Sequence, residues 1–203
     1  MRRFPPVRFS RLNRFPPPAR FAITGTLLLG LSACGTTTAP GPAAPASVAA
    51  AAPSAATFGG TDLAWVEITI AMDEQLLPLL DLVPGKAADQ RLVQLSTQVR
   101  DLHERELGDL RALHDEARLP AENPHKGMPM PGMVTPEQVA EAAAARGAAF
   151  DDLVVRRLTA HLEQGVTLAE SERKAGVEPR TRALAEQVLD SRRTYLSLLT
   201  SFS

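Results

Sequence analysis

The sequence contains one cysteine, Cys34, and few aromatic residues, which make up 4% of its 203 positions. A single cysteine excludes a disulfide bond within the chain. The chain also lacks a CxxC pair, a glycine-rich phosphate-binding loop and any motif that places a nucleophile beside a general base. These absences argue against an enzyme, and we expect a protein without catalytic residues.

Residues 1–20 lack acidic residues but carry six arginines, and the apolar run that follows them, residues 21–31, has only 11 residues. Such a run is too short to span a membrane comfortably as a permanent helix. It leads into Leu31-Ser32-Ala33-Cys34, in which small residues precede the cysteine. The pattern predicts a lipoprotein signal peptide over residues 1–33, cleaved before a lipidated Cys34. The alternative is that Cys34 is a chance thiol beside a short membrane anchor.

No charged residue occurs from position 35 to 60, where Ala, Pro, Thr, Ser and Gly dominate. Such a segment cannot bury a core, so we expect residues 34–60 to form a disordered linker that tethers the chain to the cell membrane. Removal of residues 1–33 leaves 16 basic and 23 acidic side chains, a net charge of −7. This acidic balance argues against a nucleic-acid partner. Together these features predict an extracytoplasmic lipoprotein anchored to the membrane.

The rest of the chain repeats itself with a shift of 89 residues. Residues 72–113 and 161–202 align without a gap and are identical at ten of 42 positions, where background composition gives about three. In each copy, apolar residues recur at three-and-four spacing over two segments, which is typical of two helices. We therefore predict an all-α fold in which residues 61–203 form a four-helix bundle of two helical hairpins, at about 61–116 and 136–202.

Local signals predict where the helices of the first copy begin and end. Thr61 or Asp62 can cap the first helix. Pro78 predicts a kink or an early end, because proline removes one backbone hydrogen bond. The pair Pro84-Gly85 then predicts the turn, and Asp89 is placed to cap the second helix.

The second copy is preceded by a strong helix start, Thr135-Pro136-Glu137-Gln138, which combines an N-cap, a proline at the first helical position and a capping box. The alanine-rich residues 137–149 are expected to carry this helix past Gly147 into the apolar stripe of the second copy. Gly176 is placed to end that helix, and Pro179 to open the last one.

Three stretches carry a resemblance to a known family: the segment HKGMPMPGMVTPE at residues 125–137, Phe150-Asp151, and RALAE at residues 182–186. Over roughly residues 60–202 the chain resembles the bacterial family called domain of unknown function 305 (DUF305). The resemblance implies a ferritin-like helical bundle that is secreted or lipid-anchored. For some members it also implies the handling of copper or other metals in the cell envelope.

The ligand pattern of that family is only partly kept in this sequence. The resemblance implies paired histidines on the first helix of each hairpin, and a Gln, a Glu and a Met on the second. The paired-histidine positions fall on Met72-Asp73 and His161-Leu162, and the Gln positions on His103 and Arg192. The Glu positions fall on Glu106 and Tyr195, and the Met positions on Leu110 and Leu199. One of the four histidines remains, so the resemblance implies a metal-handling ancestry with metal binding weakened or lost.

His103 and Glu106 lie three residues apart on the face expected to point into the bundle, so both can reach one ligand. Neighbouring helices can complete a mixed nitrogen, oxygen and sulfur set that suits copper, with Met72, Asp73 and His161. One alternative is that Arg192 takes the place of the metal, bonded to Glu106 and Tyr195, while His161 is a hydrogen-bonded core histidine. Another is that these side chains are exposed to solvent.

The loop between the two copies offers a second candidate copper site, made of His125, Met128, Met130 and Met133. Clustered thioethers and an imidazole are soft ligands for cuprous ion, although loop methionines also serve as packing residues. We thus predict a secreted, lipid-anchored envelope protein of metal-handling ancestry, with copper as the metal. The alternative is a metal-free structural or protein-interaction module of the envelope.

Overall fold

The computed structural model describes residues 57–202, so the predicted signal peptide, the predicted lipidation site Cys34 and most of the predicted linker lie outside the described residues. The described part is helical, and no strand occurs in it. This confirms the predicted all-α fold. The elements are α1 (Gly60–Lys86), α2 (Gln90–Glu116), α3 (Pro136–Ala144), α4 (Gly147–Ala175), α5 (Pro179–Leu199) and the short 3₁₀ helix η1 (Thr200–Phe202).

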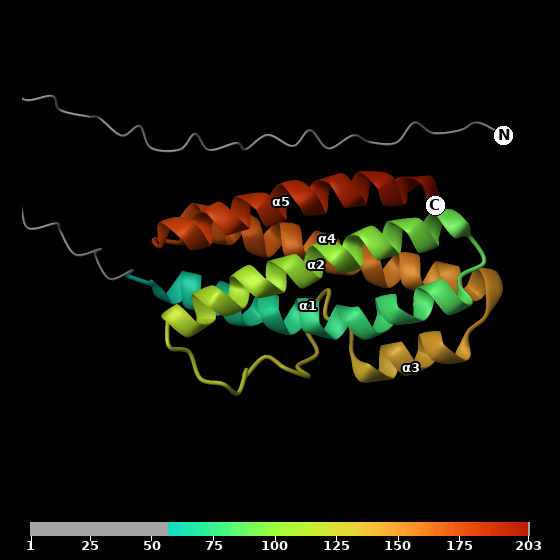
Figure 1. Cartoon of the computed structure of the whole chain (residues 1–203), viewed down its shortest axis with the longest axis horizontal. Coiled ribbons are helices and arrows are strands. Elements are labelled where there is room, and N and C mark those ends of the chain that lie inside the picture. Colours follow the sequence, from blue (N-terminus) through green and yellow to red (C-terminus); the bar gives the residue numbers. More distant parts are fainter. Residues whose placement is uncertain (1–56, 203) are drawn as a thin grey trace, which may run out of the picture. The chain divides into compact units, whose positions relative to one another are not determined.

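The four long helices run lengthwise beside one another as two hairpins, α1–α2 and α4–α5 (Figure 1). Helix α1 packs against both α2 and α4, and α4 packs against α5. The short helix α3 lies against α1 and α4. Within residues 57–202, no helix is long and apolar enough to cross a membrane.

The bounds of the turns follow the sequence repeat. Helix α1 ends at Lys86 and α2 begins at Gln90, whereas α4 ends at Ala175 and α5 begins at Pro179. Both boundaries differ by the same shift of 89 residues. The two hairpins are therefore structural as well as sequence repeats.

One aspartate of each hairpin also accepts hydrogen bonds from the backbone of the turn in the other hairpin. Asp62 on α1 accepts hydrogen bonds from the backbone N–H groups of residues 177–178 in the α4–α5 turn. Asp151 on α4 accepts the equivalent bonds from residues 88–89 in the α1–α2 turn. Because Asp62 and Asp151 are again 89 positions apart, the bundle has an approximate internal two-fold relation.

The apolar interior is divided into two clusters. One is built around the α1–α2 turn and the first half of α4, and its buried members include Leu79, Val83, Leu92, Phe150 and Leu158. The other surrounds the far end of the bundle and includes Trp65, Leu107, Leu110, Leu184 and Leu189. Each of the four long helices also buries polar or charged side chains.

Several predicted boundaries are confirmed. Asp89 caps α2 through the N–H of Arg91, and Thr135 and Gln138 form the predicted capping box at α3. Gly176 is the C-cap of α4, and Pro179 opens α5.

Two predictions for α1 are wrong, the cap at Thr61 or Asp62 and the turn at Pro84-Gly85, and the helix does not end early at Pro78. Helix α1 contains both Pro78 and Pro84 and runs on to Lys86. Both prolines are exposed, so the carbonyl that loses its donor lies at the solvent side, where water can replace the bond. The N-cap is Gly59 rather than Thr61 or Asp62; Asp62 lies one turn inside the helix and accepts the Gly59 N–H at 2.6 Å.

The predicted continuous helix through Gly147 is also wrong. Helix α3 ends at Ala144, Ala145 and Arg146 are extended, and α4 begins at Gly147 with a φ of 58°. Lys86 from α1 donates to the carbonyl of Ala143 at 2.6 Å and so satisfies the end of α3. Alanine composition does not show this break, because it depends on a lysine far away in the sequence. Helix α3 is thus an addition outside the repeat.

Candidate metal-binding site in the bundle core

Between the two apolar clusters lies a layer of buried polar side chains, to which all four long helices contribute. Its members are Asp73 from α1, His103 and Glu106 from α2, His161 from α4 and Arg192 from α5. Arg192 is only 1% exposed. Charged side chains are almost never buried to this extent unless they are paired.

Two imidazoles and one carboxylate in this layer meet at a single point. Nε2 of His103 lies 3.0 Å from Nε2 of His161. The same two atoms lie 3.6 Å and 3.5 Å from Oδ1 of Asp73. All three residues are buried, and one ligand atom from each can be chosen so that the three lie within 4.8 Å of one another. The group can therefore hold a metal ion.

The protonation of His103 is set by its backbone contact. Its Nδ1 lies 2.8 Å from the carbonyl oxygen of Val99, and a carbonyl only accepts, so Nδ1 carries a hydrogen. Burial lowers the pKa of His103 to about 3, so the ring is neutral at pH 7. Its Nε2 therefore presents a lone pair to His161. A ring oriented through its other nitrogen by a backbone carbonyl is a common feature of metal-ligating histidines.

Arg192 lies in the same layer and binds both carboxylates. Its Nη2 is 2.7 Å from Oε2 of Glu106 and 3.3 Å from Oδ1 of Asp73. Its Nη1 donates to Oε1 of Glu106 at 3.1 Å, so the pair with Glu106 is bidentate. Ser191 adds a hydroxyl donor to Oε1 at 3.3 Å.

The guanidinium of Arg192 also acts to lower the pKa values of Asp73 and Glu106. Burial favours the neutral form of Asp73, but His103 and Arg192 hold its pKa below the ordinary value. Burial and the negative charge of Asp73 together raise the pKa of Glu106, although Arg192 opposes this shift. Arg192 is therefore the cation that compensates the buried carboxylates.

Gly165 on α4 makes room for Arg192. A β-carbon at Gly165 would lie 3.1 Å from Nε and 3.3 Å from Cγ of Arg192. In the sequence repeat, Gly165 corresponds to the buried Leu76, and Arg192 corresponds to His103. The second copy thus has Gly165 in place of Leu76 and Arg192 in place of His103, and the small glycine leaves space for the long arginine.

The loop methionines do not gather as predicted. Met133 is buried against Met72 of α1, with Met130 packed beside them, and Gln75 donates to Sδ of Met133 at 2.7 Å. Met128 is 46% exposed, and neither it nor His125 belongs to this cluster. The cluster therefore joins one methionine of a helix to two of the four residues expected from the loop.

The core also differs from the predicted ligand set. Glu106 faces Arg192 rather than the imidazole pair. Tyr195 is half-buried beside the first apolar cluster, and no hydrogen bond from it to Arg192 or Glu106 occurs among the residues described. The contact between Asp73 and Arg192 was not predicted, and neither was the role of Gly165, although the repeat pairs glycine with leucine at that position.

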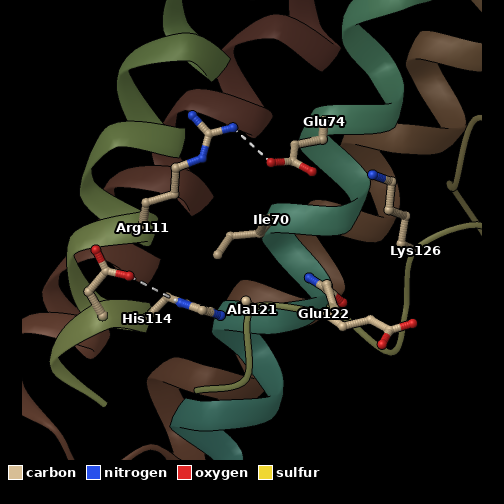
Figure 2. A pocket seen from close by; sticks show the side chains of 9 residues that line it. Ile70, Glu74, Arg111, His114, Ala121, Glu122 and Lys126 are labelled. Atoms are coloured by element: carbon tan, nitrogen blue, oxygen red, sulfur yellow. Dashed lines mark hydrogen bonds and ion pairs between the residues drawn. The ribbon is translucent and has the colours of Figure 1, made fainter. Parts of the chain in front are cut away.

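A cleft with a volume of about 590 Å³ lies elsewhere, between α1, α2 and the loop after α2. Figure 2 shows Arg111 reaching from α2 to Glu74 of α1 at its opening, where the two form an ion pair of 2.7 Å. Both side chains are substantially exposed. The cleft lacks the buried titratable groups that mark a functional pocket, so we place the candidate site in the bundle core.

The fold and the buried layer define a helical-hairpin bundle with an imidazole–carboxylate group at its centre. A family model described as "Domain of unknown function (DUF305)" matches residues 62–202, and the chain belongs to this family. This confirms the resemblance seen in the sequence. No curated protein matches the chain.

Solved structures share the fold at low sequence identity. A putative secreted DUF305 protein from Streptomyces coelicolor is 18% identical, with a TM-score of 0.62 over 70% of this chain and 91% of that one. A DUF305 fragment from Deinococcus radiodurans is 15% identical, with a TM-score of 0.63 over 72% and 96%. CopM in its Cu(I)-bound form is 16% identical, with a TM-score of 0.60 over 71% and 96%. At these identities the similarity shows the fold.

Proposed function

We propose that this chain is a lipid-anchored, extracytoplasmic binding protein of metal-handling ancestry in which Arg192 has taken the place of a core metal charge. One observation carries the proposal: Nη2 of Arg192 lies 3.3 Å from Asp73 and 2.7 Å from Glu106, and so bridges the two buried acids. CopM, which has the same fold, was solved with Cu(I), Cu(II) and silver, and this supports the ancestry.

The position of Arg192 disfavours a divalent ion. Two unit charges 4 Å apart repel by about 4 kcal/mol at an effective dielectric constant of 20, and a divalent ion is repelled twice as strongly. The guanidinium also occupies Oδ1 of Asp73, the oxygen that faces both imidazoles. Ions such as Zn²⁺ and Cu²⁺ would therefore meet a cation that already binds the nearest carboxylate oxygen.

A monovalent soft ion fits the remaining donors better. The residues that would hold it are His103 and His161, whose Nε2 atoms face each other, and neutral imidazoles suit copper. Nδ1 of His161 has no partner with good hydrogen-bond geometry within residues 57–202, and the backbone of Gly132 lies beside the ring, so Nδ1 can carry the hydrogen when Nε2 becomes a ligand. Copper(I) is thus the ion that the core can bind, and we expect weak binding.

Removal of the guanidinium should strengthen copper(I) binding. In the double variant Arg192→Met/Glu106→Gln, one positive and one negative charge are removed together, which leaves Asp73 free as a ligand at unchanged net charge. We expect the affinity for Cu(I) to rise at least about tenfold, corresponding to 1.4 kcal/mol. Anaerobic competition against a chromogenic cuprous chelator measures this change.

Two further variants locate the site. Adding His161→Leu to the double variant should abolish the gain, whereas Met130→Leu/Met133→Leu should leave it unchanged. If the wild-type protein binds copper tightly and the methionine substitutions abolish that binding, the copper site is the cluster of Met72, Met130 and Met133. No binding by any variant would favour the second candidate, a metal-free interaction module of the envelope whose core is closed by Arg192.

Membrane attachment is proposed to depend on Cys34, because cleavage of the predicted signal peptide would remove the apolar residues 21–31. A diacylglyceryl group supplies two acyl chains, which suffice for stable anchoring where one is marginal. We expect Cys34→Ser to abolish labelling with a radioactive fatty acid and to move the protein out of the membrane fraction. Retention of Cys34→Ser in membranes, without lipid label, would indicate an uncleaved N-terminal anchor instead.

A further inference from the structure

The two aspartates that close the turns are repeat-equivalent, but their surroundings differ. Asp62 accepts three backbone N–H groups: Gly59 at 2.6 Å, Val177 at 3.0 Å and Glu178 at 3.1 Å. Asp151 accepts two, from residues 88 and 89, at 3.0 and 2.9 Å. The additional contact, from Gly59, is local to the start of α1, so Asp62 joins that start to the α4–α5 turn.

Next to Asp62 lies a buried acid that has no equivalent in the first copy. Glu172, near the end of α4, is 0% exposed, and the repeat places the buried Val83 at the corresponding position. The carboxyl groups of Glu172 and Asp62 lie at the same turn, because Oε1 of Glu172 lies against Gly176 and Asp62 accepts the N–H of Val177. Neither Glu172 oxygen has a donor among the described residues, and a carboxyl–carboxyl hydrogen bond with Asp62 contributes to the raised pKa of Glu172. Two carboxyl groups can form such a bond only when one of them carries a proton.

The backbone around Glu172 is adapted to this arrangement. A β-carbon at Gly176 would overlap Oε1 of Glu172, and the repeat counterpart of Gly176 is Ala87. The second copy therefore lacks a side chain at the position where Glu172 needs the space. This makes the buried acid a built feature of the α4–α5 turn.

We propose that Glu172 and Asp62 form a proton-operated clamp that holds the start of α1 on the α4–α5 turn and loosens when Glu172 loses its proton. Asp62 is the ionised partner, because a carboxylate is the form that accepts three backbone N–H groups. After deprotonation, two buried carboxylates face each other, with Glu178 beside them; Arg182 is an opposing charge, and Arg180 is paired with Glu178. The clamp does not depend on the metal layer.

The direction of the pH effect follows from burial and from Asp62. Burial and the contact with Asp62 raise the pKa of Glu172 from 4.5 to about 8. The closed state therefore binds one more proton than the open state between these two values. The stabilisation by the clamp is complete below pH 4.5 and is lost as the pH rises through about 8.

Amide hydrogen exchange can test the clamp with a control inside the same molecule. After correction for intrinsic base catalysis, we expect the amides of Val177 and Glu178 to open more than about tenfold more often at pH 8 than at pH 6. The equivalent amides of residues 88 and 89 are held by Asp151, whose neighbouring acids Asp89 and Asp152 are not buried, and they should not change. Glu172→Gln, which can donate to Asp62 at every pH, should remove the difference, whereas the exposed control Glu163→Gln should not.

A second measurement needs no variant. Carbon-13 NMR of the Glu172 carboxyl group in the wild-type protein should show a titration midpoint near pH 8. A midpoint of 4 to 5 would overturn the proposal, and so would equal pH responses of the two turns. Persistence of the pH response in Glu172→Gln would assign it to another group and would likewise overturn the proposal.

Discussion

Replacing Arg192 by methionine should lower the free energy of unfolding by about 3–5 kcal/mol, the range measured when one partner of a buried ion pair is removed. Methionine has a similar volume, so little of this loss comes from packing. The loss arises because Asp73 and Glu106 remain buried without their shared cation. Chemical denaturation monitored by circular dichroism at pH 7 measures the change.

The neighbouring Arg193 provides a matched control. It pairs with Glu170 at 2.6 Å, but both side chains are about half exposed, and exposed ion pairs contribute less than about 1 kcal/mol. Arg193→Met should therefore have little effect. Adding Glu106→Gln to Arg192→Met should recover part of the loss, because one uncompensated carboxylate is then removed.

Treatment with a chelator can show whether the guanidinium of Arg192 or a bound metal ion is the cation that stabilises the core. If Arg192 stabilises the core, treatment of the purified wild-type protein with a strong chelator should leave its melting temperature unchanged. A lower melting temperature after chelation, together with a small effect of Arg192→Met, would show that a metal ion stabilises the polar layer.

Gly132→Ala should detach the loop that covers α4. Gly132 has a φ of 73°, and a β-carbon there would lie 2.5 Å from Cβ of Gln164 and 2.8 Å from the carbonyl oxygen of Ala160. The left-handed backbone costs an alanine about 1–2 kcal/mol, and overpacking against a helix backbone adds about 1–3 kcal/mol. Together these costs exceed what a single loop contact supplies, so we expect residues 128–134 to leave the bundle.

Methionine oxidation followed by mass spectrometry reads out the detachment. Met133 is 4% exposed and Met128 is 46% exposed, so peroxide should oxidise Met133 much faster in Gly132→Ala while the rate at Met128 stays the same. Gly127→Ala is the matched control, because Gly127 has a φ of 78° in the same loop but open space around its α-carbon. Slow oxidation of Met133 in Gly132→Ala would mean that α4 shifts to accommodate the new β-carbon and that the loop stays in place.

Local signals explain why much of the fold could be predicted from the sequence. The cap at Asp89, the capping box at Thr135 and Gln138 and the proline that opens α5 act over a few residues, and they are where they were expected. Whether the helix would continue through Pro78 was harder to predict, because the free-energy cost of the lost hydrogen bond depends on whether the unpaired carbonyl faces water. The end of α3 depends on Lys86, a residue nearly 60 positions away.

The turn contacts show a signal that was present but not used. Asp62 and Asp151 are identical residues at equivalent repeat positions, and each binds the opposite hairpin's turn. Reading the differences between the copies, such as Glu172 against Val83, would have marked the acid pair as a departure from the repeat. Its burial and its contact with Asp62 still required the tertiary structure.

By itself, the sequence determined that two helical hairpins repeat, that their apolar faces meet, and that Glu106 and Arg192 approach the same layer, because periodicity and repeat symmetry depend only on the order of residues. Only the tertiary structure decided which partners these charges take. It placed Asp73 on Arg192, brought the two Nε2 atoms to 3.0 Å, and buried Met133 while leaving Met128 exposed. The physical reason is that buried charges and thioethers choose partners by distance and desolvation across helices, and the spacing of residues within one helix does not contain that information.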